Sequence, residues 1–321
     1  MMEPLLGKFI VTAGMISLSV VFGAFCRRRN WAGDRAAEAL MTFVAVFGYP
    51  VVGFLSIWGI RLTASDLALP VMAGAQCVVM TFVSLALSGF VSRDSSERGL
   101  LAIAGGVGNN GFTMGAFVLY LLAGEEGLAL SGVYGLIFTP VVVFLLYPIA
   151  KRYSSKGPPT SLLRLALKNL TDWRSIGLPV TVMAMALSWA GIRRPAFVSD
   201  LRLVDVITYT SLPAAFFAIG LRLRLSGIWD LRRHVLWLAG MRFVGGACVG
   251  VALAAITRLT PWGFHGVRWT VFVVQSFVPM SVSSVAVANM FSLKADEASA
   301  LFVANTFMYL ALVLPIVFGV F

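Results

Sequence analysis

Charged side chains are scarce in this sequence, and acidic ones are the scarcest. Only 14 of the 321 residues are Asp or Glu, and no acidic residue lies inside a long apolar stretch away from its ends. Histidine occurs twice and cysteine three times, without the spacing of a zinc site or the even number of a disulfide framework. An intramembrane enzyme would need paired carboxylates, a histidine-rich metal cluster or an activated nucleophile at membrane depth. The sequence therefore predicts no catalytic site, no metal and no cofactor.

Apolar residues, by contrast, make up 59% of the chain, above the roughly 45–50% of an average soluble domain. They form continuous runs rather than the alternating pattern of a β-barrel. A bilayer core takes about 20 apolar residues per helix. Ten windows of about this length are low in charge: 4–25, 37–60, 66–91, 99–123, 127–150, 175–192, 203–221, 235–257, 269–291 and 298–320. We therefore expect an all-α integral membrane protein with ten transmembrane helices.

The net charge of +11 is explained by where the basic residues lie. If the N-terminus is outside, 17 of the 25 Lys and Arg residues fall in the inner loops, which is the positive-inside pattern. The charge thus indicates orientation and argues against a nucleic-acid partner. Arg27 to Arg29 follow the first window, which predicts a retained helix rather than a signal peptide. We expect a multi-pass protein of the cell membrane, in bacteria the inner membrane, with both termini extracytoplasmic.

Proline positions shared by the two halves of the chain indicate an internal repeat. Pro50 and Pro213 are each followed by a Gly-x-Arg-Leu sequence, and the sequence distance between them nearly equals that between Pro148 and Pro315. These matching offsets predict two five-helix repeats, 1–150 and 175–321. An odd number of helices inverts the second repeat, as in many secondary transporters. Residues 151–174 are predicted to be a basic cytoplasmic linker with an amphipathic stretch at 161–170.

Polar residues and helix breakers gather in the fourth and ninth windows. Residues 105–115 contain five glycines and two asparagines, and residues 275–284 contain a proline among amide and hydroxyl side chains. Glycine lowers helix propensity, and proline removes a backbone donor. We expect both helices to break there and to free backbone groups that suit a ligand. The predicted substrate-binding residues are Gly108, Asn109, Asn110, Gly111, Thr113, Gln275, Pro279, Ser281, Ser283, Ser284 and, from the tenth window, Asn305.

Other interpretations of these polar residues stay open. Glycines in membrane helices also serve close packing, and a proline also makes a simple kink. Arg242, the one basic residue deep inside a window, either attracts an anion or pairs with carbonyl groups at a helix end. Tyr134 and Asn305 either complete a polar site or bond between helices. Because the broken windows themselves contain no Lys or Arg near the breaks, we expect half-helix dipoles to hold an anionic solute.

The same residues resemble a known family. The sequence Gly108-Asn109-Asn110-Gly111-Phe112, followed by Gly124 to Leu128, is similar to the first-repeat signature of the auxin efflux carrier family, within the bile/arsenite/riboflavin transporter superfamily. The stretch from Pro279 through Asn289 to Leu314-Pro315 resembles the second repeat. The resemblance implies two inverted five-helix repeats with broken, crossing helices 4 and 9. It also implies a scaffold of helices 1, 2, 6 and 7 and a moving transport core of helices 3–5 and 8–10.

The function that the resemblance implies is secondary-active or facilitative transport of a small organic anion, an auxin-like carboxylate or a dicarboxylate. Transport would proceed by elevator-type alternating access at the helix 4/9 crossover. Two alternatives stay open: a sodium-coupled symporter of the bile acid:sodium symporter type, and a non-transporting membrane sensor. That symporter type uses acidic and amide side chains at its sodium sites, whereas residues 105–115 and 275–284 offer only amides, hydroxyls and carbonyls. The expected partners are the organic anion and membrane lipid, and a homodimer stays open.

Overall fold

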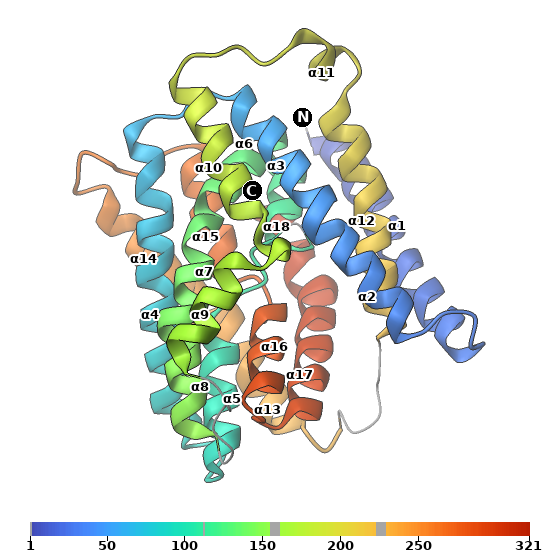
Figure 1. The fold of residues 1–321 in the computed structure, drawn as a ribbon, viewed down its shortest axis with the longest axis vertical. Helices are drawn as coiled ribbons and strands as arrows, with labels where there is room; N and C mark the ends of the chain where they lie inside the picture. Colours follow the sequence, from blue (N-terminus) through green and yellow to red (C-terminus); the bar gives the residue numbers. More distant parts are fainter. Residues whose placement is uncertain (1, 112, 155–160, 223–228) are drawn as a thin grey trace. The chain divides into compact units, whose positions relative to one another are not determined.

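The computed structural model describes residues 2–111, 113–154, 161–222 and 229–321. Within these ranges the chain is helical (Figure 1). The one β-type pairing in the described ranges is an isolated bridge between Gly108 and Met280. The prediction of an all-α protein is confirmed. Phe112 and linker residues 155–160 lie outside the described ranges.

Six helical segments in the described part of the chain are long and apolar enough to cross a membrane, against the ten predicted. They are Asp34–Gly59, Ala64–Ser88, Gly115–Tyr153, Leu203–Leu221, Arg232–Thr257 and Ala295–Val320. The other four windows contain α1 (Met2–Arg28), α10 (Gly177–Trp189), and two helices interrupted by non-helical backbone. Large apolar side chains are exposed along these segments; Leu18, Val71 and Val244, for example, are 64–71% exposed. Long helices with exposed apolar faces are those of a membrane-embedded protein.

The helices pack into two compact units. Unit 1 comprises Met1–Thr63, Gly111–Val133 and Asp172–Leu223, and unit 2 comprises Ala64–Asn110, Tyr134–Thr171 and Arg224–Phe321. Unit 1 contains α1, α2 (Asp34–Phe43), α3 (Tyr49–Gly59), α10, α11 (Ala196–Asp200), α12 (Leu203–Leu221) and nearly all of α6 (Gly115–Tyr134). Unit 2 contains α4 (Ala68–Ser88), α5 (Ser95–Gly106), α7 (Phe138–Val141), α8 (Tyr147–Tyr153), α9 (Leu162–Thr171), α13 (Arg232–Ala239), α14 (Gly246–Thr257), α15 (Val267–Ser276), α16 (Val282–Met290), α17 (Ala295–Met308) and α18 (Leu314–Val320).

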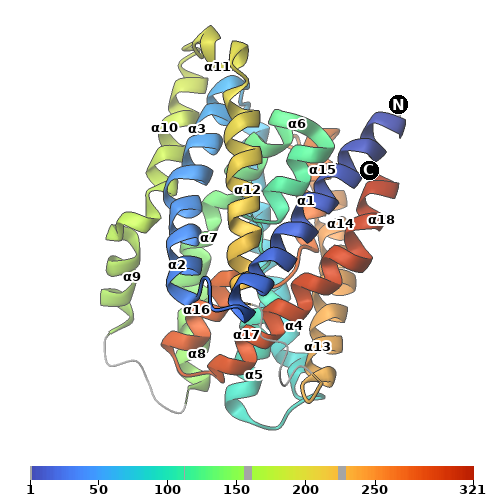
Figure 2. The ribbon, with the colours of Figure 1, turned by 90° about the vertical axis from the view of Figure 1, so that its right-hand side faces the viewer.

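Close packing of α1 along α12 holds unit 1 together (Figure 2). A Cβ atom at Gly23 would lie 2.3 Å from the carbonyl oxygen of Phe217, and one at Gly220 would lie 2.2 Å from that of Val20. The two backbones therefore touch, and a side chain at either glycine would force the helices apart. At the end of this contact lies a small core of Cys26, Ala37, Ala218 and Leu221.

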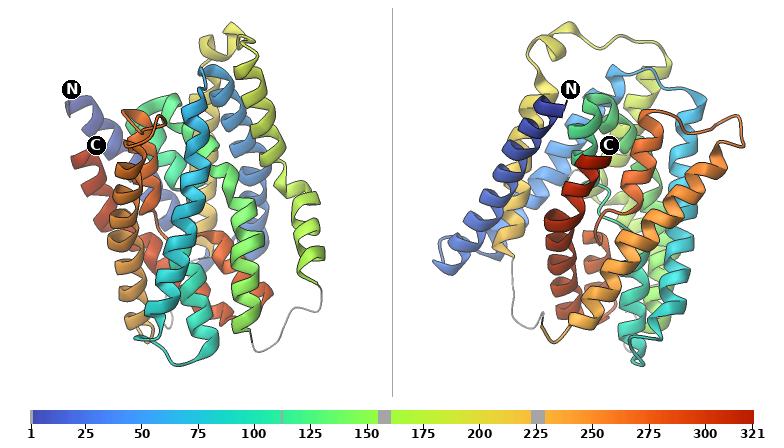
Figure 3. Two further views of the ribbon diagram at one scale, coloured as in Figure 1. Left: turned by 90° about the vertical axis from the view of Figure 1, so that its left-hand side faces the viewer. Right: turned by 180° about the vertical axis from the view of Figure 1, so that it is seen from behind.

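Unit 2 has a core of its own, in which Leu101, Leu146 and Phe291 are fully buried. Helix α4 packs along α5 and also against α14, and α13 packs against α17 (Figure 3). Helix α16 contacts both α5 and α17. Helices α5 and α16 are thus each supported by other helices of this unit.

Three π-helical segments directly precede a proline-containing turn. Val44–Gly48, Val142–Leu146 and Tyr309–Val313 are each followed by a helix whose second residue is proline, namely Pro50, Pro148 and Pro315. Proline lacks an N–H group and clashes with the preceding turn, and the wider π turn relieves both problems. The second and third segments are offset along the sequence by the same distance as their prolines. The inverted repeat itself stays a prediction.

The predicted amphipathic stretch at 161–170 forms helix α9, Leu162–Thr171. Leu163 and Leu167, one helical turn apart, are 71% and 54% exposed. An apolar stripe of this kind suits a helix lying on a membrane surface.

Candidate functional site

The first interruption lies between α5 and α6. Helix α5 ends at Gly106, the backbone at Val107 is extended (φ −124°, ψ 129°), and α6 begins at Gly115. A Cβ atom at Gly106 would lie 2.0 Å from Thr81 Oγ1 of α4. Both interpretations of the glycines therefore hold here, since they end the helix and also let α5 approach α4.

The second interruption lies between α15 and α16. Helix α15 ends at Ser276, Pro279 follows in non-helical backbone, and α16 begins at Val282. Ser281 caps α16, because its Oγ accepts a hydrogen bond from the N–H of Ser283 at 3.0 Å. Both predicted helix breaks are confirmed.

The two interruptions bind each other through their backbones, and we call residues 107–110 and 278–281 the junction. The N–H of Asn109 donates to the carbonyl of Pro279 at 2.7 Å, and the N–H of Ser281 donates to the carbonyl of Val107 at 3.1 Å. These bonds flank the antiparallel bridge between Gly108 and Met280. Backbone groups freed by one break therefore satisfy those freed by the other, as an environment without water requires.

Buried amide side chains reinforce the junction. Asn110 Nδ2 donates to the backbone carbonyl and to the side-chain oxygen of Gln275, at 2.8 and 2.9 Å. Gln275 Nε2 donates to the carbonyl of Asn110 at 3.1 Å. Asn305 Oδ1, from α17, accepts from the N–H of Met280 at 2.8 Å. All three amide residues are at most 5% exposed, so in this conformation they hold the broken helix ends together.

Arg242, in the π-helical turn between α13 and α14, also reaches the junction and is 2% exposed. Its Nη1 donates to the carbonyl of Gly105 at 3.1 Å. Nε and Nη2 donate to the carbonyl of Val278 at 3.0 and 2.8 Å, and Nη2 also donates to that of Ser276 at 3.3 Å. Gly105 and Ser276 lie in the last turns of α5 and α15, whose carbonyls have no partner within their helices. Of the two interpretations of Arg242, pairing with helix-end carbonyls is the one observed.

This arrangement corrects the expectation that no lysine or arginine is fixed at the breaks. A full positive charge lies at the junction, because a long side chain from another helix reaches it. Among the described residues, no ion pair joins this charge to an acidic side chain. A Cβ atom at Gly108 would lie 2.3 Å from Arg242 Nη2, so a side chain at position 108 would displace the guanidinium.

Gln76 of α4 binds the end of α15 beside the junction, a role that was not predicted from the sequence. It is 3% exposed, its Nε2 donates to the carbonyl of Ser276 at 3.0 Å, and its Oε1 accepts from the hydroxyl of Tyr134 at 3.1 Å. Tyr134 therefore bonds between helices. A lone amide in the apolar run 68–88 is the signal that could have identified Gln76, because a polar side chain at membrane depth needs a partner.

The structure brings most of the predicted substrate-binding residues together. Gly108, Asn109, Asn110, Gln275, Pro279, Ser281 and Asn305 lie in or beside the junction. Ser284 donates to the carbonyl of Ile103 at 3.0 Å, and Ser283 is partly exposed at the start of α16. Gly111 and Thr113 belong to unit 1. That any of these residues binds a solute stays a prediction.

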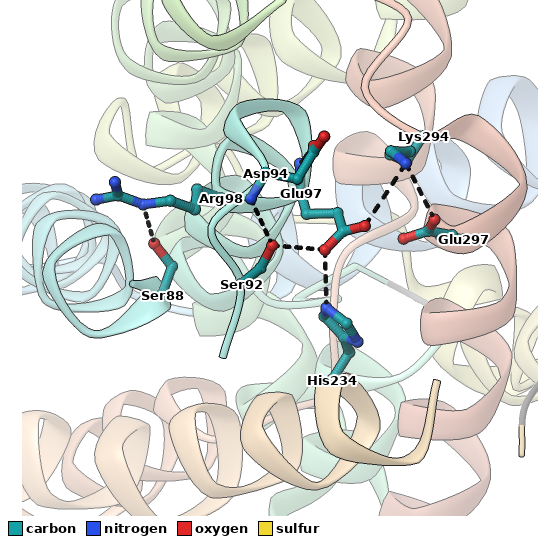
Figure 4. Close-up of polar contacts among 8 residues, drawn as sticks. All are labelled: Ser88, Ser92, Asp94, Glu97, Arg98, His234, Lys294 and Glu297. Carbon is teal, nitrogen blue, oxygen red and sulfur yellow. Dashed lines mark hydrogen bonds and ion pairs between the residues drawn. The ribbon is translucent and has the colours of Figure 1, made fainter. Parts of the chain in front are cut away.

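A second polar group in unit 2, the charge cluster, consists of Ser92, Asp94, Glu97, His234, Lys294 and Glu297 (Figure 4). Glu97 is its centre: the carboxylate accepts from Ser92 at 2.6 Å and lies 3.3 Å from His234 and 3.5 Å from Lys294. The negative charges of Glu297, Asp94 and Glu97, that of Glu297 most, raise the pKa of Lys294. The cluster brings the ends of α5, α13 and α17 together.

Comparison with known proteins identifies no family. No model of a protein family matches the chain, and a search of curated proteins found no match either. The likeness to auxin efflux carriers therefore rests on the residues that carry it.

Proposed function

We propose that this chain is a secondary-active or facilitative transporter of a small organic anion, a carboxylate or dicarboxylate, of the auxin efflux carrier kind. The observation that carries the proposal is the buried guanidinium of Arg242 at the junction of two interrupted helices. Its partners are carbonyl dipoles of Gly105, Ser276 and Val278, which orient the side chain and carry no net charge. A unit of positive charge in a medium of low dielectric constant attracts an anion strongly.

The proposed movement is of the elevator type, in which one unit binds the solute and moves across the membrane relative to the other unit. Two features support it. Each unit has its own buried core, and the junction lies within unit 2 alone. Unit 1 contains the first, second, sixth and seventh windows, which are the scaffold helices that the family resemblance implies, together with Gly111–Val133 from the fourth and fifth windows.

The proposed orientation places both termini outside the inner membrane of a bacterial cell and α9 inside. Single cysteines at Lys168 and at Phe321 test it with an impermeant thiol reagent in intact cells. We expect labelling at 321 and none at 168 until the cells are opened. The reverse pattern would invert the orientation.

Sodium coupling ranks second. Carbonyl groups at half-helix C-termini bind Na⁺ in many transporters. Here the carbonyls of Gly105, Ser276 and Val278 already accept hydrogen bonds from Arg242, which leaves less room for a metal ion among them.

The test is uptake of radiolabelled indole-3-acetate and succinate into proteoliposomes, with and without sodium and pH gradients. Each carboxylate is also paired with its neutral amide and its amine as competitors. We expect uptake above that of empty liposomes, inhibited by carboxylates and not by amines. Equal competition by the amine would refute the anion proposal, and saturable binding without uptake would favour the sensor.

A further inference from the structure

Three polar groups on one side of α17 and the π turn that follows it have no hydrogen-bond partner among the described residues. They are Asn305 Nδ2, Thr306 Oγ1 and Tyr309 OH. The three residues are 0%, 3% and 0% exposed. Residue 309 lies four positions after 305 and three after 306, so all three share one side of the helix. Unpaired polar groups at such depth are rare in native proteins and call for a ligand or a water molecule.

Asn305 lies directly beside the junction, and Tyr309 packs against the segment that contains Arg242. Asn305 uses its other amide atom, Oδ1, to accept from the N–H of Met280 in the second interruption. The ring of Tyr309 packs against that of Phe243, the neighbour of Arg242 in sequence, with centroids 5.9 Å apart. Both aromatic residues lie in π-helical turns, which are frequent at functional sites.

The chemistry of the three groups fits an anion. The Asn305 amide carries two hydrogens on nitrogen, and each of the two hydroxyls carries one. A carboxylate only accepts hydrogen bonds and offers two oxygens with about four lone-pair positions. A neutral amide solute would instead bring N–H groups that meet further donors.

We propose that Asn305, Thr306 and Tyr309 form the subsite that binds the carboxylate of the transported solute. The inference rests on the proposed function and deepens it, because it assigns the carboxylate to α17 and leaves Asn110 and Gln275 to hold the helix breaks. The solute oxygens accept from Nδ2 and from the two hydroxyls, and the charge of Arg242 favours the ionised acid.

The test is binding of benzoate, with benzamide as its neutral counterpart, to the full-length protein in detergent. Thr306→Val replaces a hydroxyl by a methyl group, Tyr309→Phe removes a hydroxyl, and Asn305→Asp keeps the acceptor for Met280 while replacing the donor. Tyr120→Phe is the matched control, since its hydroxyl donates to Asp205 and both residues belong to unit 1. We expect benzoate affinity to fall about tenfold in Thr306→Val and Tyr309→Phe, equivalent to about 1.4 kcal/mol. The Tyr120→Phe protein should bind benzoate within about twofold of wild type, although its melting temperature falls.

Three outcomes would overturn this inference, and only the third also overturns the proposed function. If the wild-type protein binds benzoate better than benzamide, and Thr306→Val and Tyr309→Phe bind it equally well, the subsite is wrong while an anion transporter stands. The melting temperature of those variants could also rise while their benzoate affinity stays unchanged. That result would mean that the two hydroxyls are unsatisfied polar groups that bind no solute, and it too would overturn the subsite. If the wild-type protein binds neither benzoate, indole-3-acetate nor succinate, the proposed function falls and the subsite falls with it.

Discussion

Replacing Arg242 by methionine is the most direct test of the junction. The change removes a buried cation and its hydrogen bonds to three carbonyls while keeping a long unbranched side chain. The carbonyl of Ser276 keeps its bond from Gln76 Nε2 at 3.0 Å, but the carbonyls of Gly105 and Val278 lose their bonds from the guanidinium. The loss therefore falls on one group in each interrupted helix.

The expected magnitude follows from these two carbonyls. A buried polar group left without its partner costs about 1–3 kcal/mol, so two cost about 2–6 kcal/mol. Methionine also removes the penalty of burying a charge, which places the net loss at the lower end, about 2–3 kcal/mol. An unfolding entropy of about 2.1 cal/mol/K per residue gives about 1.5 °C per kcal/mol for 321 residues, so the melting temperature should fall by about 3–5 °C.

The assay is thermal unfolding of purified protein in detergent, followed by loss of the monodisperse peak in size-exclusion chromatography. Arg233→Met is the matched control, because Arg233 is exposed on α13 and the substitution removes the same charge. The melting temperature of Arg242→Lys should lie between those of Arg242→Met and Arg233→Met, since lysine keeps the charge without the planar fork of donors. If Arg242→Met melts at the same temperature as Arg233→Met, the junction does not depend on this side chain.

A second variant in the same assay tests whether the guanidinium of Arg242 occupies the position at which a coupling cation would bind. Arg242→Ala frees the carbonyls of two half-helix C-termini, the groups that bind Na⁺ in many transporters. Sodium chloride should therefore stabilise Arg242→Ala more than N-methylglucamine chloride does, and should leave the wild-type protein unchanged. Specific stabilisation of the wild-type protein by sodium would move the sodium-coupled symporter ahead of the present proposal.

Three further predictions concern other parts of the chain. Asn110→Ala should lower the melting temperature in detergent, because it removes two buried hydrogen bonds to Gln275, each contributing about 0.5–1.5 kcal/mol; an unchanged value would contradict its structural role. Gly220→Leu should prevent recovery of monodisperse protein, since its side chain would meet the Val20 carbonyl, whereas Gly319→Leu, with open space around it, should not. Lys294→Gln should lower the melting temperature at neutral pH, and should have no such effect at a pH well above 10.5. The raised pKa of Lys294 means that its stabilisation is complete below its unfolded value and is lost as pH rises through the folded one, which melting curves across alkaline pH can show.

The helix breaks could be predicted because their causes are local. Gly105 and Gly106 weaken the helix at its end, and Pro279 cannot continue one, whatever the rest of the fold does. The sequence could predict that the two breaks lie near each other, but not which of their backbone groups pair. The donor and acceptor of each hydrogen bond lie on segments far apart in sequence. The wide turns before Pro50, Pro148 and Pro315 were expected as ordinary helix, since proline predicts a disturbance but not its form.

The roles of single polar side chains were harder to predict. Arg242 was assigned two alternatives, because the sequence shows that a buried arginine needs partners and does not show which carbonyls its long side chain reaches. Gln76 was missed because it stands alone among apolar residues, and its partner Ser276 is 200 residues away. Two of the ten predicted spans, the fourth and the ninth, are not continuous helices long enough to cross a membrane. The reason is that the breaks that form the junction interrupt them.

The pairing of the two breaks also constrains how the protein is made. Asn109 donates to a carbonyl at Pro279, which belongs to the other half of the chain and is synthesised much later. At about 5–20 residues per second, roughly 10–30 s separate the synthesis of the two partners. During that interval α5, which has only 12 residues, is too short to cross a bilayer and has open backbone groups at its end. We therefore expect the open end of α5 to stay hydrated or bound to a chaperone until the ninth window is synthesised. Insertion into the membrane is then complete only when the two breaks pair.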